Sequence, residues 1–286
     1  MKGVHKIRVL CSVLQVARSG YYRWRRGHPC PRRIKDAELS RRIALIHKKS
    51  RGAYGVPRIV AELREEGISI SRRRCGRLMR SLGLRGRKRS GRRPRTTDSR
   101  HNHPVAQNHL KDRPAPSGPN RVWITDITYL RTQEGWLYLA AVLDAWSRRV
   151  LGWASAVTLH TSLVLAAFSD ALERRRPPDG VVFHSDRGSQ FAQKQFKSAL
   201  KVAGMIQSMS RARNCYDNAT MESFWSSFKV ESTLDRNIPA TRQLARLAVF
   251  DYIETFYNPV RRHSSLGMIS PVTFEKQQQI NKSKAA

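Results

Sequence analysis

Three acidic residues stand in segments that could fix their direction. Asp126 lies in VWITDITYL, Asp186 ends VVFHSD, and Glu222 lies in ATMESFWSSFKVE, thirty-five residues after Asp186. Carboxylates are the ligands that hard cations such as Mg²⁺ prefer. Two such ions about 3.5–4 Å apart can neutralise a phosphate and activate a hydroxyl at once. The three acids therefore predict a site for two Mg²⁺ or Mn²⁺ ions that acts on phosphodiesters.

The segments around these acids predict the elements that hold them. Asp126 and Asp186 each follow a short apolar, β-rich run, which predicts a strand. Glu222 lies in a segment with helical spacing. On a helix Glu222, Ser226 and Lys229 share one face, and the apolar face packs on the sheet. That apolar face consists of Met221, Phe224 and Phe228. Lys229 is then expected to meet a DNA phosphate.

Three other acids compete for the same role. Asp144 ends the run WLYLAAVLD, Asp217 lies just before the Glu222 segment, and Glu231 follows Lys229 by two residues. Asp217 and Asn218 have the short polar side chains that cap a helix N-terminus. Spacing alone does not exclude Asp144.

Four motifs carry a family resemblance: WITDITYL, FHSDRGSQF, SRARNCYDNATMESFWSSFKVE and YNPVRRHSSLGMISPVTFE. They closely resemble the OrfB transposases of the insertion-sequence three family, relatives of retroviral integrases, over nearly the whole chain. The resemblance implies a ribonuclease-H-like core in which Asp126, Asp186 and Glu222 are the catalytic, metal-binding triad. By resemblance, and not by spacing, Asp144 is set aside.

Charge indicates the partner. The 286 residues hold 54 Lys+Arg and 21 Asp+Glu, a net charge of +33. Residues 1–115 carry +25 of it and residues 116–286 carry +8. Such an excess predicts nucleic acid or an anionic membrane surface as the partner, and the family resemblance implies double-stranded DNA. The longest apolar run, residues 136–143, is too short to cross a bilayer, and no signal pattern is present. We expect a cytoplasmic, nucleoid-associated bacterial protein with no membrane partner.

The first two predicted domains are helical. Residues 1–30 form a small segment with Leu10, Val13, Leu14 and Val16 at helical spacing, a turn at residues 18–20, and then YYRWRR, whose aromatics we expect to pack and whose arginines we expect to meet DNA. Residues 31–84 are predicted to form a helix-turn-helix-like DNA-binding domain, with helices at 36–49, 57–66 and 71–82. Its expected core is Ile59, Leu63, Leu78 and Leu82. Its expected DNA contacts are Arg72, Arg73, Arg74, Arg77 and Arg80.

The remaining chain is predicted to form a linker, a core and a tail. Residues 85–120 are basic and Pro-rich, which predicts a linker that is disordered or extended without DNA. Residues 121–235 predict three antiparallel strands, then helix, strand, helix, strand and helix. This order predicts an α/β fold, a ribonuclease-H-like mixed sheet flanked by helices. Arg211 and Arg213, in the loop before the last helix, are expected to hold a flanking phosphate.

Residues 236–286 are predicted to form a C-terminal helix and a tail that packs on the core. The helix, 241–257, is expected to bury Leu244, Leu247, Phe250, Ile253 and Phe256. After it, Arg261 and Arg262 either face DNA or belong to a strap on the core, and the sequence leaves both open.

Cysteine and histidine spacing predicts no zinc site. Cys11, Cys30, Cys75 and Cys215 are scattered without a C-x-x-C pair. His101, His103 and His109 cluster without a following cysteine pair, so we interpret them as linker residues.

The leading hypothesis is a DNA transposase that cuts at insertion-sequence ends and transfers the freed 3′-hydroxyl by transesterification. The absence of a P-loop motif agrees. The alternatives are a catalytically silent DNA-binding regulator derived from a transposase, and a structure-specific nuclease of the same fold. Joining two DNA ends implies a homo-oligomer. The resemblance adds the upstream-frame product of the same element as a possible partner or fused segment.

Overall fold

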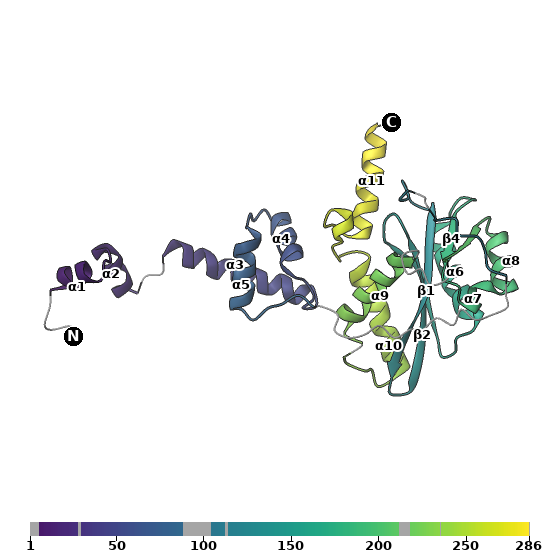
Figure 1. Ribbon diagram of the computed structural model, residues 1–286, viewed down its shortest axis with the longest axis horizontal. Coiled ribbons are helices and arrows are strands. Elements are labelled where there is room, and N and C mark those ends of the chain that lie inside the picture. Colours follow the sequence, from purple (N-terminus) through teal and green to yellow (C-terminus); the bar gives the residue numbers. More distant parts are fainter. Residues whose placement is uncertain are drawn as a thin grey trace. The chain divides into compact units, whose positions relative to one another are not determined.

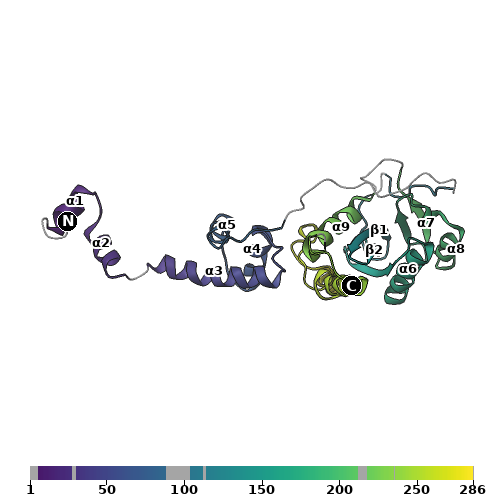
Figure 2. The same cartoon turned by 90° about the horizontal axis from the view of Figure 1, so that it is seen from below.

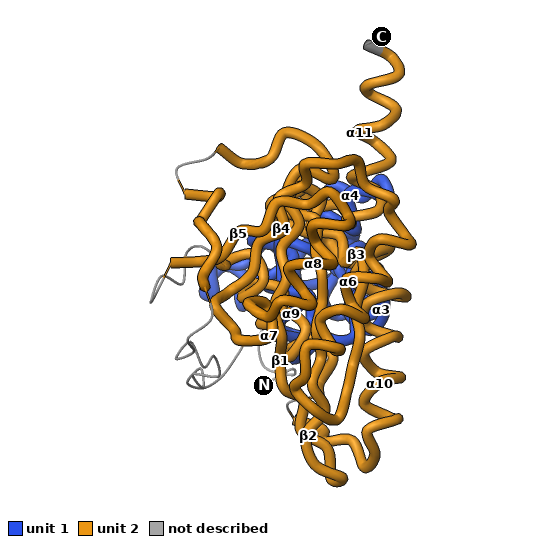
Figure 3. Tube along the Cα trace, turned by 90° about the vertical axis from the view of Figure 1, so that its right-hand side faces the viewer, with its two compact units in different colours: residues 1–86 blue, residues 87–286 orange. Residues whose placement is uncertain are grey.

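The computed structural model describes residues 6–27, 30–87, 104–111, 114–211, 218–234 and 236–285. The chain folds into two compact units, Met1–Gly86 and Arg87–Ala286 (Figure 3). Each unit is described by itself.

The smaller unit contains a three-helix core. α3 (Pro31–Lys49), α4 (Val56–Glu65) and α5 (Arg72–Ser81) bury Ile43, Ile59 and Leu63 completely. Proline opens α3 and α4, and the Ser71 hydroxyl caps α5 by accepting from the Arg74 backbone N–H at 3.2 Å. The predicted helix-turn-helix-like pattern is confirmed. Leu82 was expected in this core but is 40% exposed, because α5 ends before it.

The first two helices differ from the prediction. α1 (Ile7–Val13) is followed by α2 (Arg18–Arg25), so the predicted turn at residues 18–20 is instead the first turn of a helix. Val13 and Trp24 are each 75% exposed. The expected packing of the aromatics is therefore wrong for Trp24, because two helices of seven and eight residues are too short to enclose a core.

The larger unit is a five-stranded mixed sheet, as predicted. β1 (Val122–Thr132), β2 (Gly135–Asp144) and β3 (Val150–Ala156) form an antiparallel meander. β4 (Val182–Ser185) and β5 (Ile206–Met209) run parallel to β1, which gives the order β3-β2-β1-β4-β5.

Helices cover both faces of this sheet (Figures 1 and 2). One face carries α6 (Thr161–Arg175), α7 (Ser189–Ala192) and α8 (Lys194–Val202), and the other carries α9 (Ala219–Ser232) and α10 (Arg242–Phe250). Gly152 lets α6 approach β3, since an added Cβ would lie 2.3 Å from the Ala171 backbone nitrogen.

The predicted C-terminal helix turns a different side to the sheet. α10 continues as a π-helical segment, Asp251–Tyr257, and is followed by a 3₁₀ turn, Ser264–Leu266, and by α11 (Pro271–Ala285). Ile253 and Phe256 are buried as predicted. The other three residues expected inside are 50 to 58% exposed, and Ala245, Val249, Tyr252 and Tyr257 are buried instead. The exposed three are Leu244, Leu247 and Phe250.

Residues 104–111 of the predicted linker are hydrogen-bonded to β5. The Met209 backbone N–H donates to the Gln107 carbonyl at 3.4 Å, and the His109 N–H donates to the Ser208 hydroxyl at 2.9 Å. This stretch is therefore not a free tether. Residues 88–103 and 112–113, with His101 and His103 among them, lie outside the described residues.

Candidate active site

Asp126 and Asp186 lie on neighbouring parallel strands. β1 and β4 pair from Val122 opposite Val182 to Ile124 opposite His184, so Asp126 and Asp186 each follow the last pair by two residues. Alternate residues of a strand face the same side, and paired strands lie about 4.8 Å apart. The two carboxylates are therefore neighbours on one face of the sheet. Both are locally anchored: Asp126 Oδ1 accepts from the Ile127 N–H at 2.8 Å, and Asp186 Oδ1 accepts from the Gly188 N–H at 2.9 Å.

α9 carries Glu222 to the same place. Met221, Phe224 and Phe228 are at most 2% exposed, so the predicted apolar face packs on the sheet. Trp225, one turn after Glu222, donates from its indole nitrogen to Asp126 Oδ2 at 3.1 Å. Residues three apart on a helix are neighbours on its surface, so this bond sets Glu222 close to Asp126.

Asp186 and Glu222 lie near enough to Asp126 for their charges to act on it. Burial raises the pKa of Asp126 well above its usual range, and the negative charges of Asp186 and Glu222 raise it further. No three His, Cys, Asp or Glu side chains of the described residues lie close enough to hold one metal ion together. The donor set nevertheless fits a hard divalent cation, because all its oxygens are carboxylate and a cation would relieve their repulsion.

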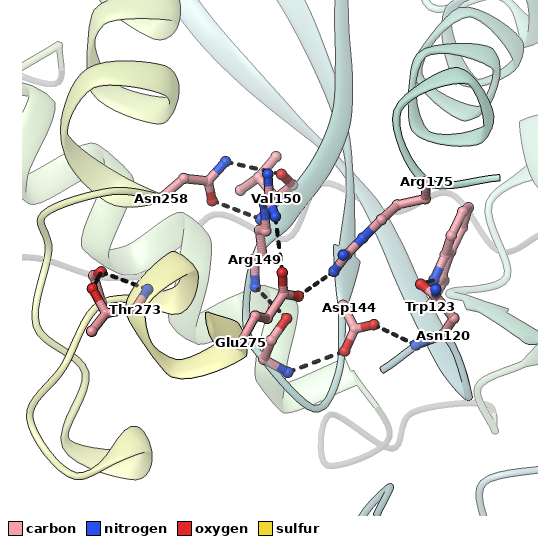
Figure 4. A network of polar contacts seen from close by, with 11 residues as sticks. Asn120, Trp123, Asp144, Arg149, Val150, Arg175, Asn258, Thr273 and Glu275 are labelled. Carbon is pink, nitrogen blue, oxygen red and sulfur yellow. Dashed lines mark hydrogen bonds and ion pairs between the residues drawn. The ribbon is translucent and has the colours of Figure 1, made fainter. Parts of the chain in front are cut away.

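Two competing acids have structural partners. Asp144 is fully buried and accepts backbone hydrogen bonds from Asn120, Trp146 and Ser147 at 2.8, 2.8 and 3.1 Å (Figure 4). Glu231 is 5% exposed and forms an ion pair with Arg261 at 2.5 Å. The third competitor, Asp217, lies outside the described residues. Asn218 occupies the N-cap position of α9, but its side chain makes no cap hydrogen bond.

The structure decides between the two alternatives for the C-terminal arginines, and the assignment of both to DNA is wrong. Arg261 and Arg262 are 3% and 7% exposed, so they do not face DNA. Arg261 donates to Glu231 and to the Ser227 hydroxyl, and Arg262 donates to the Met268 carbonyl at 2.7 Å. Arg261 therefore fastens the segment 258–270 to α9, and Arg262 closes a turn within that segment.

The other predicted DNA contacts differ in accessibility. Arg211 is exposed and Lys229 is half-buried, while Arg213 lies outside the described residues. On α5, Arg74 and Arg77 form ion pairs with Asp36 at 2.8 and 2.7 Å. Arg72, Arg73 and Arg80 are exposed on the same helix.

Two residues that hold the chain in place around Asp186 were not predicted from the sequence. His184 is completely buried between the hydroxyls of Ser208 and Ser210, at 2.9 and 3.1 Å. Gly188 leaves the Asp186 carboxylate close to the turn, because an added Cβ would lie 3.0 Å from Asp186 Oδ1 and would have to displace it. The motif FHSDRG contained both residues, but their role depends on contacts with β5 and within the turn.

Comparison with known proteins defines the class first. Residues 116–215 and 203–271 match two family models, each described as an integrase core domain, and residues 33–93 match an HTH-like domain. With the mixed sheet, these matches define an integrase-type polynucleotidyl transferase that carries a helix-turn-helix-like domain.

Close relatives then give the family. The chain is 43% identical over 267 residues to the "Insertion element IS600 uncharacterized 31 kDa protein" of Shigella sonnei, covering 93% of this chain and 97% of that protein. It is 40% identical over 271 residues to "Transposase InsF for insertion sequence IS3A" of Escherichia coli (strain K12), covering 94% and 93%. The chain belongs to the IS3 family of transposases, and it is a DNA transposase.

Solved structures include viral integrases. An intasome of simian T-cell lymphotropic virus is 15% identical with a TM-score of 0.47, covering 82% of this chain and 74% of that one. The HTLV-2 integrase catalytic core domain in complex with magnesium is 16% identical with a TM-score of 0.43, covering 55% of this chain and 97% of that one.

No helix within the described ranges is both long and apolar enough to cross a membrane.

Proposed function

We propose that Asp126, Asp186 and Glu222 are the catalytic acids of this transposase and that they hold two divalent metal ions, Mg²⁺ or Mn²⁺. The observation that carries the proposal is geometric: Asp126 and Asp186 follow the paired segments of β1 and β4, and Trp225 of α9, one turn after Glu222, donates to Asp126 Oδ2 at 3.1 Å. Without a metal ion, the repulsion between acids that lie close together opposes folding. The same negative charge favours the binding of a cation. Bound metal would supply charge neutralisation at the phosphate and activation of the attacking hydroxyl.

The residues around the acids have supporting roles in this proposal. Trp225 and Gly188 orient the carboxylates of Asp126 and Asp186 through the hydrogen bonds at 3.1 and 2.9 Å. Lys229 and Arg211 contact phosphates that flank the scissile bond, and Arg213 joins them. The chemistry is cleavage at the element ends followed by attack of the freed 3′-hydroxyl on another strand.

The smaller unit is proposed to bind DNA through α5. Arg72, Arg73 and Arg80 are exposed for phosphate contact. Arg74 and Arg77, which hold Asp36, orient the same helix and keep donors for DNA, because a guanidinium has five N–H groups. We further propose that the chain acts on nucleoid DNA as a homo-oligomer, alone or with the upstream-frame product.

Joining of labelled element ends by the full chain tests the catalytic assignment. Wild-type protein should join ends with Mg²⁺ or Mn²⁺. Asp186→Ala should lower joining by about three orders of magnitude or more, the scale of losing a group that acts on the transition state, and should still bind DNA. Asp179→Ala, which removes an exposed acid from the turn before β4, is the control.

Each other outcome has a defined meaning. Unchanged joining by Asp186→Ala would refute the assignment. Wild-type DNA binding without cleavage in either metal would indicate a silent regulator. Cutting of branched DNA without any element end would indicate a structure-specific nuclease.

A further inference from the structure

A cavity of about 590 Å³ lies in the larger unit beside the start of α9. Its lining includes Val122 and Ile124 of β1, Trp146 and Arg148 of the β2–β3 turn, Thr220 of α9, and Phe274 of α11. Its volume is in the range of pockets that bind small molecules or single nucleotides. Ile124 and Asp126 are two residues apart on β1 and face the same side of the sheet, so the cavity lies next to the position of Asp126.

The cavity has an aromatic wall in a fixed position. The rings of Trp146 and Phe274 lie 4.8 Å apart between centroids at an angle of 58°, and both residues remain half-buried. The Trp146 backbone N–H donates to the buried Asp144 carboxylate at 2.8 Å. Glu275, the residue after Phe274, accepts from Arg149 at 2.8 Å and from Arg175 (Figure 4). These contacts anchor the backbone at Trp146 and the residue next to Phe274. Aromatic faces stack on nucleobases.

The cavity also contains a cation, Arg148, which donates one N–H to the Thr220 hydroxyl. Among the described carboxylates, that of Asp144 acts on the charge of Arg148. The backbone φ of Arg148 is +62°, a strained conformation in which a small residue would cost less. The first turn of α9 adds the positive end of a helix dipole. An anion is the ligand that this end of the cavity fits.

We propose that the cavity binds one unpaired nucleotide of the DNA substrate. The base lies against Trp146 and Phe274, and its phosphate binds Arg148 beside the start of α9. A paired base cannot enter such a cavity, so one nucleotide near the reacting end must leave the duplex, at a cost of a few kcal/mol. The proposal rests on DNA as the substrate, not on the metal ligands.

An abasic-site scan tests this directly. The full chain is bound to a fluorescent duplex of the element end, and one base at a time is removed from either strand. Removing the base that pairs with the extruded nucleotide abolishes the pairing cost, so we expect about tenfold tighter binding at one position. Trp146→Ala, Phe274→Leu and Arg148→Gln should lose this gain.

Matched controls separate the cavity from general effects. Trp136→Ala and Arg246→Gln remove an exposed tryptophan on β2 and an exposed arginine on α10, and both should keep the gain. Phe274→Leu removes the aromatic ring but retains apolar volume. It therefore still tests the cavity if Trp146→Ala fails to fold. An equal effect at every position, or a gain that persists in Arg148→Gln and Phe274→Leu, overturns the proposal. The scan measures binding and can be repeated in Asp186→Ala, so its failure is distinguishable from failure of the metal assignment.

Discussion

The larger unit contains two groups of buried or half-buried acids with opposite electrostatics. Burial alone would raise the pKa of Glu275, but hydrogen bonds and charge from Arg175, with a further hydrogen bond from Arg149, outweigh it and lower the pKa. Burial and two neighbouring acids instead raise the pKa of Asp126. The first group stabilises the fold. The second concentrates negative charge, which lowers the stability of the metal-free fold and favours the binding of a cation.

The network around Glu231 shows how the first group works. Arg261 donates to both Glu231 oxygens, at 2.5 and 2.8 Å, and Tyr252 donates to one of them at 2.9 Å. Burial raises the pKa of Tyr252, and the charge of Glu231 raises it further, so the hydroxyl stays a donor. A buried ion pair is retained only with such hydrogen bonds, because desolvation of both ions opposes folding.

The largest expected stability effect comes from breaking this pair. Arg261→Met leaves Glu231 buried without its cation and should lower the free energy of unfolding by about 3–5 kcal/mol. Urea midpoints at equal m-values measure it. The double variant Arg261→Met/Glu231→Leu should recover most of the loss. A single-variant cost below about 1 kcal/mol would mean that Arg261 does not stabilise the fold, and the comparison would fail.

A smaller loss is expected at Glu275. Glu275→Gln should cost about 1–3 kcal/mol at neutral pH, because Arg149 and Arg175 lose a charged acceptor. Since the folded pKa is lowered, the contribution of Glu275 is present above its usual value of 4.5 and disappears as pH falls through the lowered pKa. The difference between wild type and variant should therefore narrow in acid. A difference that widens below about pH 4.5 would contradict the sign of the shift.

The smallest expected effect on stability has the opposite sign. Asp126→Asn should stabilise the metal-free chain by about 1 kcal/mol at neutral pH, although it should abolish joining. The folded pKa of Asp126 is raised, so its ionised form opposes folding at high pH and this penalty disappears as pH falls. Urea midpoints without metal and in chelator measure the change. Destabilisation as large as that of Glu275→Gln would place Asp126 in the structural group.

The sheet was predictable because its determinants are local. The short loops after Thr132 and Asp144 predict the meander, and the apolar runs before Asp126 and Asp186 predict strands β1 and β4. The apolar face of α9 was predictable for the same reason. Each pattern lies within one segment of about ten residues.

The errors arose where a partner distant in sequence decides the outcome. Nothing in the sequence around Arg261 predicts its ion pair with Glu231, thirty residues away. The 241–257 segment has two apolar stripes, and the sequence does not say which one meets the sheet. The stripe with Tyr252 and Tyr257 is buried because their hydroxyls find Glu231 and the Arg148 carbonyl, at 2.9 and 3.1 Å. Only the folded chain brings these groups together.

Calorimetric titration of the full chain with Mn²⁺ tests the central claim most directly. Wild-type protein and Glu275→Gln should bind Mn²⁺ alike, and Asp126→Asn, Asp186→Asn and Glu222→Gln should each weaken binding by at least about tenfold. Folding is checked in parallel by urea midpoints, so lost binding is not mistaken for lost structure. Binding that is absent in the wild type, or unchanged in both aspartate variants, would contradict the account.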